Sequence, residues 1–87
     1  MSTKKVTVID VRNQDDFNAN HMNGALNIPF NELPQRMREI SGENDAVFIC
    51  SSSGESSSKA EQLLRGNGFS NVYDGGSWQD LNQLMNN

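Results

Sequence analysis

The chain has 87 residues, of which 34% are hydrophobic and 21% are charged. This length supports one compact domain with a modest core and excludes a second domain of ordinary size, so we expect a single domain over residues 1–87. The formal net charge is −4, and the 7 lysines and arginines are scattered along the chain rather than clustered. Both features argue against a nucleic acid as partner.

Hydropathy and cysteine content exclude further classes of protein. The longest wholly apolar stretch, Ala46–Cys50, is far short of the roughly 20 residues that cross a bilayer, and the N-terminus has no apolar signal region. We expect a soluble monomer that does not bind membranes and is cytoplasmic, or periplasmic if an export signal has been removed. The single cysteine, Cys50, excludes an internal disulfide and a multi-cysteine zinc site, and we expect neither a metal nor an organic cofactor.

The first part of the chain predicts a strand, a helix and a strand. An alternating run rich in β-branched residues predicts a strand over 5–11. Acidic residues at the start of the segment 15–20 favour the N-terminus of a short helix. The turn signal Asn23-Gly24 is followed by a run that predicts a second strand over 25–29.

A second helix is predicted after this strand. Asn31 is a suitable N-cap, and Pro34 falls in the first turn, where its missing N–H costs nothing. The apolar face of the helix comprises Leu33, Met37 and Ile40. We expect the helix to end at Ser41-Gly42.

The segment 46–50 is continuously apolar, which is typical of a central parallel strand covered on both faces. A small polar loop over 51–55 follows, and helical spacing of apolar residues predicts a helix over 56–65. Gly66-Asn67-Gly68 then supplies a residue that tolerates positive φ, which is typical of a helix C-terminus.

The C-terminal part predicts one more strand and one more helix. Val72-Tyr73 predicts the strand, Asp74-Gly75-Gly76 a turn, and Ser77 the N-cap of the helix. The apolar stripe of this helix comprises Trp78, Leu81, Leu84 and Met85. Because strands and helices alternate, we expect an α/β fold: a small, mainly parallel sheet of about four or five strands, right-handed crossovers and helices on both faces.

Cys50 is the candidate nucleophile, because it ends the most hydrophobic predicted strand and ligands of parallel sheets bind beyond the carboxyl ends of the strands. Small polar residues after it allow a loop whose N–H groups point inward, and the next helix adds its positive end. We therefore expect the pKa of Cys50 to lie about two units below the usual value of about 8.5. The predicted substrate-binding loop comprises Ser51, Ser52, Ser53, Gly54, Glu55, Ser56 and Ser57.

Two simpler interpretations remain open at this point. Cys50 can be a small buried hydrophobic residue without chemistry, and the serine run can be a flexible linker. The position of the run between a buried strand and an amphipathic helix argues against a linker.

Several short segments together resemble a known family. They are Val8-Ile9-Asp10-Val11-Arg12, Phe17, the segment 21–29, the segment 47–50, the segment 68–73 and Gly75-Gly76-Ser77-Trp78. In this order and spacing they resemble the single-domain rhodaneses, and among these the short phage-shock-protein-E type, over residues 6 to about 84. The resemblance implies a rhodanese-like fold, a thiosulfate:cyanide sulfurtransferase or sulfur-carrier activity, and Cys50 as the residue that becomes a persulfide.

The segment after Cys50 departs from the pattern of this family. Rhodaneses that use thiosulfate commonly carry Arg or Lys there, whereas residues 51–58 include neither and contain Glu55, which would repel a dianion if it faced the site. The loop is also slightly longer than usual, which resembles the dual-specificity phosphatases and arsenate reductases. Those enzymes usually have a histidine before the cysteine and an arginine closing the loop, where this chain has Ile49 and Ser56.

Three further residues are expected to support the site structurally. Asp10 and Arg12 lie on one face of a strand end and resemble the family's aspartate–arginine pair, which we interpret as an ion pair or hydrogen-bond brace. His21 is expected to make a conformational hydrogen bond rather than to act as a base for the thiol. Asp74 lies near a strand end without a spacing that requires a role. The aromatic residues expected in the core or at its rim are Phe69, Tyr73 and Trp78.

Three functions remain as hypotheses. In the first, the Cys50 thiolate takes sulfane sulfur from thiosulfate, a polysulfide or a persulfide, and cyanide or a thiol removes it. In the second, the chain is a sulfur-delivery module that passes a persulfide to a protein acceptor without turnover of small donors. A small phosphatase or arsenate reductase is less favoured, because the loop offers no cation or general acid for the leaving group.

Overall fold

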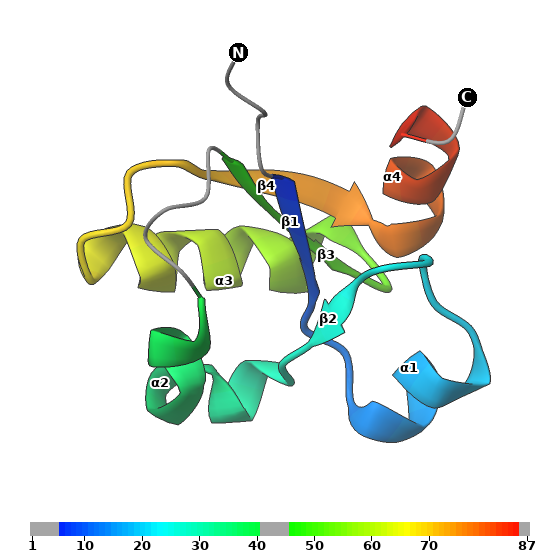
Figure 1. The fold of residues 1–87 in the computed structure, drawn as a ribbon, viewed down its shortest axis with the longest axis horizontal. Helices are drawn as coiled ribbons and strands as arrows, with labels where there is room; N and C mark the ends of the chain where they lie inside the picture. The colour runs from blue at the N-terminus through cyan, green and yellow to red at the C-terminus, as the bar shows by residue number, and fades with distance from the viewer. Residues whose placement is uncertain (1–5, 41–45, 86–87) are drawn as a thin grey trace, which may run out of the picture.

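The computed structural model describes residues 6–40 and 46–85. The predicted helix end at Ser41-Gly42 lies outside this part of the chain. Within it, the strands form one parallel sheet of four strands in the order β2-β1-β3-β4, with helices packed against it (Figure 1). The strands are β1 (Val6–Asp10), β2 (Leu26–Asn27), β3 (Ala46–Ser51) and β4 (Val72–Ser77). The expected α/β architecture is confirmed.

Helices connect the successive parallel strands, and one more helix follows the last strand. They are α1 (Gln14–Ala19), α2 (Leu33–Arg36), α3 (Gly54–Gly66) and α4 (Trp78–Met85), with short 3₁₀ turns η1 (Phe30–Glu32) and η2 (Met37–Glu39) on either side of α2. The side chain of Asn13 accepts the N–H of Asp16 and caps α1. Gly68 has φ +98°, which confirms the positive φ expected after α3.

Two apolar clusters cover the two faces of the sheet. One comprises Ile9, Val11, Ile28, Leu33, Ile40, Val47, Ile49, Ala60, Leu64 and Val72, and therefore includes α2 and α3. The other comprises Val8, Met22, Cys50 and Leu81, with Ala25, Phe48 and Trp78 packed against it, and includes α4. Because successive strand residues point to opposite faces, Ile49 belongs to the first cluster and Cys50 to the second. Helices on both faces are confirmed.

Two predicted helix boundaries and one predicted apolar stripe differ from the structure. Asn31 lies within η1, and the N-cap of α2 is Glu32, because the Glu32 N–H bonds to Pro29 O at 2.8 Å and forms a 3₁₀ turn first. The helix expected to begin at Ser56 begins at Gly54, directly after the extended residue Ser53. The expected apolar stripe of α4 is buried only in part, since Leu84 is 76% exposed.

The predicted turn at Asp74-Gly75-Gly76 is part of β4, which continues to Ser77. The register passes from Ile49 opposite Asp74 to Ser51 opposite Ser77, so Gly75 and Gly76 together face Cys50 in a β-bulge. Gly76 has φ +77°, and a Cβ at Gly75 would lie 2.9 Å from Ile49 O. These glycines therefore allow a bulge and a close approach of two strands rather than a chain reversal.

No helix in the described ranges has the length and hydropathy needed to span a bilayer.

Candidate active site

Cys50 lies at the carboxyl end of β3, one residue before the strand ends, in the middle of the sheet edge where parallel-sheet proteins bind ligands. Its carbonyl accepts the N–H of Val11 at 3.0 Å, which fixes the end of β3 to the end of β1. Its side chain is 0% exposed and packs with Val8, Met22 and Leu81. The structure therefore holds the thiol beneath the α4 side of the sheet.

The electrostatics of Cys50 differ from the expectation of an acidic thiol. Burial, and secondarily the negative charge of Asp10, raise the pKa of Cys50 to about 12, although the positive charge of Arg12 acts in the opposite direction. Loop N–H groups and a helix terminus favour a thiolate, but desolvation in an apolar cluster has the larger effect. In this closed arrangement the thiol is protonated at neutral pH.

Asp10 and Arg12 form a buried ion pair beside the thiol. Asp10 is the register partner of Cys50, and its side chain is 0% exposed. The Arg12 guanidinium donates from Nε and Nη2 to the two carboxylate oxygens at 2.8–3.1 Å, and the Arg12 backbone N–H donates to Oδ1 at 3.0 Å. Since Arg12 also donates to Asn20 O at 2.6 Å, the pair ties β1 to the end of α1.

Two more side chains complete the surroundings of this pair. Asn27 Nδ2 donates to the carbonyl oxygens of Asp10 at 3.0 Å and Arg12 at 2.9 Å. The Trp78 ring lies 5.0 Å from the Arg12 guanidinium carbon, a cation–π contact from the start of α4. The sequence placed Trp78 in the core or at its rim, and its ring does pack against the cluster that contains Cys50.

The predicted binding loop is much shorter than expected. Ser51 is the last residue of β3 and is 3% exposed, and only Ser52 and Ser53 lie between β3 and α3. Both are exposed, and neither makes a side-chain hydrogen bond within the described residues. The other predicted loop residues, 54–57, form the first turn of α3. The N–H groups of that turn lack helical partners, so they are the hydrogen-bond donors that this region offers.

Ser57 and Asp74 form a link that the sequence did not predict. Ser57 is 0% exposed, and its hydroxyl lies 2.5 Å from Asp74 Oδ1 and 3.0 Å from Gly54 O. The same Asp74 oxygen accepts the N–H of Gly76 at 2.9 Å. The only signal in the sequence was the position of Asp74 near a strand end, where it was assigned to a turn.

The side chains of Glu55 and His21 make local contacts and do not face a donor or the thiol. The Glu55 side chain is 80% exposed and lies 3.7 Å from Lys59 Nζ, so it faces solvent rather than a pocket. The His21 ring stacks on Phe17 at 3.9 Å between centroids, and its Nδ1 lies 2.8 Å from Phe17 O. His21 thus makes the kind of local hydrogen bond that the sequence suggested.

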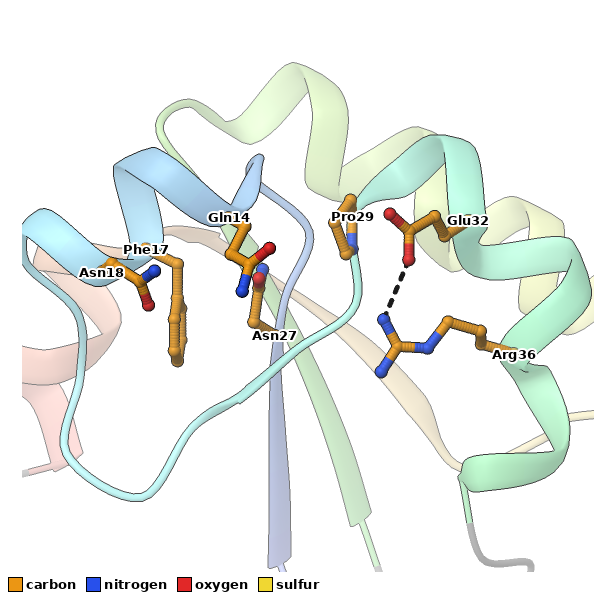
Figure 2. A pocket seen from close by; sticks show the side chains of 7 residues that line it. All are labelled: Gln14, Phe17, Asn18, Asn27, Pro29, Glu32 and Arg36. Carbon is orange, nitrogen blue, oxygen red and sulfur yellow. Dashed lines mark hydrogen bonds and ion pairs between the residues drawn. The ribbon is translucent and has the colours of Figure 1, made fainter.

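An open cleft of about 220 Å³ lies between α1 and α2 (Figure 2), and Cys50 is not one of its lining residues. It is lined by Gln14, Phe17, Asn18, Asn27, Pro29, Glu32 and Arg36. Arg36 is held by Glu32 at 3.0 Å and by Glu39 at 2.8 Å, and these hydrogen bonds raise the pKa of Arg36 and lower that of Glu39. The charges of this cleft are therefore already paired.

Comparisons with known proteins identify a matching family and several similar proteins. A family model described as "Rhodanese-like domain" matches residues 1–81. The uncharacterized protein YqhL of Bacillus subtilis is 38% identical over 71 residues, which are 82% of this chain and 56% of that protein. The thiosulfate sulfurtransferase PspE of Escherichia coli is 31% identical over 74 residues, 84% of this chain and 71% of that protein. The chain thus spans only part of the length of these relatives.

The fold comparison agrees with the sequence comparison. A solved structure described as a rhodanese with anions from E. coli has a TM-score of 0.78 and is 27% identical. The match covers 86% of this chain and 89% of that one.

Proposed function

This chain belongs to the rhodanese-like domain family, and from that premise we propose that it transfers sulfane sulfur through a persulfide on Cys50. The observation that carries the proposal is the place of Cys50 at the carboxyl end of a central parallel strand, followed after three residues by the N-terminus of α3. The first N–H groups of α3, which lack helical partners, and the positive end of its dipole lie at the same end of the sheet and would favour an anion there. The name of the E. coli relative supports the same chemistry.

The transfer takes place in two displacements. The Cys50 thiolate attacks the outer sulfur of the donor, a sulfur–sulfur bond of the donor breaks, and sulfite leaves if the donor is thiosulfate. The persulfide then loses its outer sulfur to cyanide, giving thiocyanate, or to a thiolate, giving a new persulfide. Each step returns a thiolate or persulfide anion, so no external oxidant or reductant is needed.

The burial of Cys50 sets a condition on this chemistry. Because the thiol is 0% exposed and its pKa is about 12, a donor reaches an ionised sulfur only after the surrounding side chains shift. Water that enters on opening reverses the desolvation, while Arg12 remains as the nearby cation that favours the thiolate. Opening and ionisation are therefore coupled in the proposed mechanism.

The segment after the cysteine bears on the choice of donor. Residues 51–58 contain no Lys or Arg, and α3 begins with an acidic first turn at Glu55. A dianion such as thiosulfate gains little there, whereas a polysulfide or a small persulfide needs less positive charge. The same feature supports the second candidate function, delivery of the Cys50 persulfide to a protein thiol with slow turnover of small donors.

Intact mass spectrometry tests the proposal directly. Wild-type protein incubated with thiosulfate, tetrasulfide or glutathione persulfide should gain about 32 Da per transferable sulfur, and cyanide should remove it as thiocyanate. Cys50→Ser should gain no transferable sulfur. If the serine variant produces thiocyanate as fast as wild type, or if no donor modifies the wild type, the proposed function is wrong. Loading by persulfides without steady turnover would favour the delivery role.

A further inference from the structure

The start of α3 is joined to the end of β4 through a single carboxylate oxygen. Asp74 Oδ1 lies 2.5 Å from the Ser57 hydroxyl and accepts the Gly76 N–H at 2.9 Å. A serine within a helix usually donates to the carbonyl one turn earlier, and Gly54 O is within reach at 3.0 Å. A hydroxyl has one hydrogen, and the charged, closer acceptor takes it.

The position of this contact relates it to Cys50. Asp74 stands opposite Ile49, so its side chain lies on the α3 face, and the next two residues of β4 form the bulge that faces Cys50. At the same place a Cβ on Gly54 would lie 3.9 Å from Gly76 Cα, so the first residue of α3 lies close to the bulge. The contact therefore closes the short segment 51–53 between two fixed points.

The contact includes the Ser57 hydroxyl, a polar group that is costly to bury. Ser57 is 0% exposed, and a buried hydroxyl without a strong acceptor would be destabilising. Ser52 and Ser53, which the contact encloses, have no side-chain hydrogen bonds within the described ranges. The position of the segment after Cys50 thus depends on what holds the two ends.

We propose that Asp74 and Ser57 form a clamp that positions the segment 51–53 and the start of α3 at the end of β3, where Cys50 lies, which makes Asp74 a positioning residue of the site. This rests on the proposed function only for its catalytic consequence. The clamp itself controls access to the thiol, whatever reagent approaches it. Loss of the clamp should expose Cys50 and at the same time misplace the donors that stabilise the persulfide.

Alkylation by iodoacetamide, which is small and uncharged, measures the access. Ser57→Ala should raise the alkylation rate of Cys50 by about tenfold, the effect of one lost charge-assisted hydrogen bond, and Asp74→Ala, which also removes the bond from the Gly76 N–H, by at least as much. The double variant should be no faster than Asp74→Ala, because that variant already removes the Ser57 contact. Asp74→Asn, which retains an acceptor oxygen, should stay within about twofold of wild type. Asp80→Ala is the control, since that exposed carboxylate makes no hydrogen bond or ion pair in the described part of the chain.

Persulfide formation measures the positioning. At saturating tetrasulfide, both alanine variants should form the persulfide about tenfold more slowly although their thiol is more accessible, and Asp74→Asn should recover the rate. A lower melting temperature with unchanged alkylation and unchanged sulfur transfer would overturn the clamp. If Asp74→Ala does not fold, Ser57→Ala removes the same contact by one hydroxyl. If wild type forms no persulfide while alkylation still responds to both residues, the proposed function fails and the control of access stands.

Discussion

The ends of β1 and β3 lie side by side in the sheet but are held in opposite ways. At the end of β1, Arg12 donates to Asp10 and to Asn20 O, and Asn27 donates to two carbonyls, so charged and amide side chains hold this end in place. At the end of β3, Ser52 and Ser53 make no side-chain hydrogen bond within the part of the chain that is described. The firmly held end of β1 keeps the charges beside Cys50 in place. The more loosely held end of β3 allows the Cys50 sulfur to become exposed.

The largest effect is expected from breaking the fixed end. Arg12→Ala leaves the carboxylate of Asp10, 0% exposed, without its counter-ion. An unpaired buried charge typically costs about 3–5 kcal/mol, and urea unfolding should show a loss of this size. The matched control is Arg36→Ala, whose partners are 44–50% exposed and whose loss should cost under about 1 kcal/mol. Equal losses for the two variants would contradict the distinction between the two regions.

The next largest effect is expected at Gly75, in the bulge of β4 beside the end of β3. In Gly75→Ala, the new Cβ would lie 2.9 Å from Ile49 O and 2.9 Å from Leu81 Cδ2, which forces β4 away from β3. Overpacking of this kind costs about 1–3 kcal/mol in unfolding free energy. Gly66→Ala meets no atom within 4 Å in α3 and should be neutral or stabilising by up to about 1 kcal/mol. If both alanines are equally tolerated, the bulge is not closely packed.

The dependence of stability on pH tests the environment of the Cys50 thiol. The pKa of Cys50 is raised from 9.0 to about 12, so the folded state holds the proton more tightly than the unfolded state. The resulting stability is fully present below about pH 9 and is lost progressively toward pH 12, by roughly 1 kcal/mol per pH unit. Urea unfolding at pH 8 and pH 10.5 should show this slope in wild type and a shallower one in Cys50→Ser. Parallel slopes would mean that the thiol is not desolvated.

The smallest effect is expected at Glu55. Its side chain is 80% exposed and 3.7 Å from Lys59, so Glu55→Gln should change the thiosulfate KM by less than about twofold. Glu55→Arg adds a cation at the rim and should lower the KM only modestly, with an effect that disappears at high salt. The measurement is kcat/KM for thiosulfate at fixed cyanide. A several-fold fall in KM with Glu55→Gln would show that the carboxylate reaches the donor.

Most of the fold followed from patterns that are local in sequence. The apolar run of β3 and the helical spacing of Ala60 and Leu64 predicted their elements because burial on a sheet or a helix face imposes these periods. The close spacing of Asp10 and Arg12 predicted their ion pair for the same reason, since both residues lie on one face of one strand end.

The site was predictable only in part, because its properties depend on contacts between distant segments. The pKa of Cys50 follows from packing against Met22 and Leu81, which no local spacing reveals. The glycine pair of β4 has the composition of a turn, and only the approach of Ile49 explains why it continues a strand. The contact of Ser57 with Asp74 spans 17 residues of sequence and has no motif of its own.

The bulge in β4 also determines to which face of the sheet the residues after it point. Over the same length of ladder β4 holds one residue more than β3, and side chains in a strand alternate between faces. Ser77 and then Trp78 owe their orientation to that extra residue, including the approach of the indole ring to Arg12 at 5.0 Å. A one-residue insertion or deletion in this segment would therefore turn the indole away from its cation, which a substitution that keeps the length would not do.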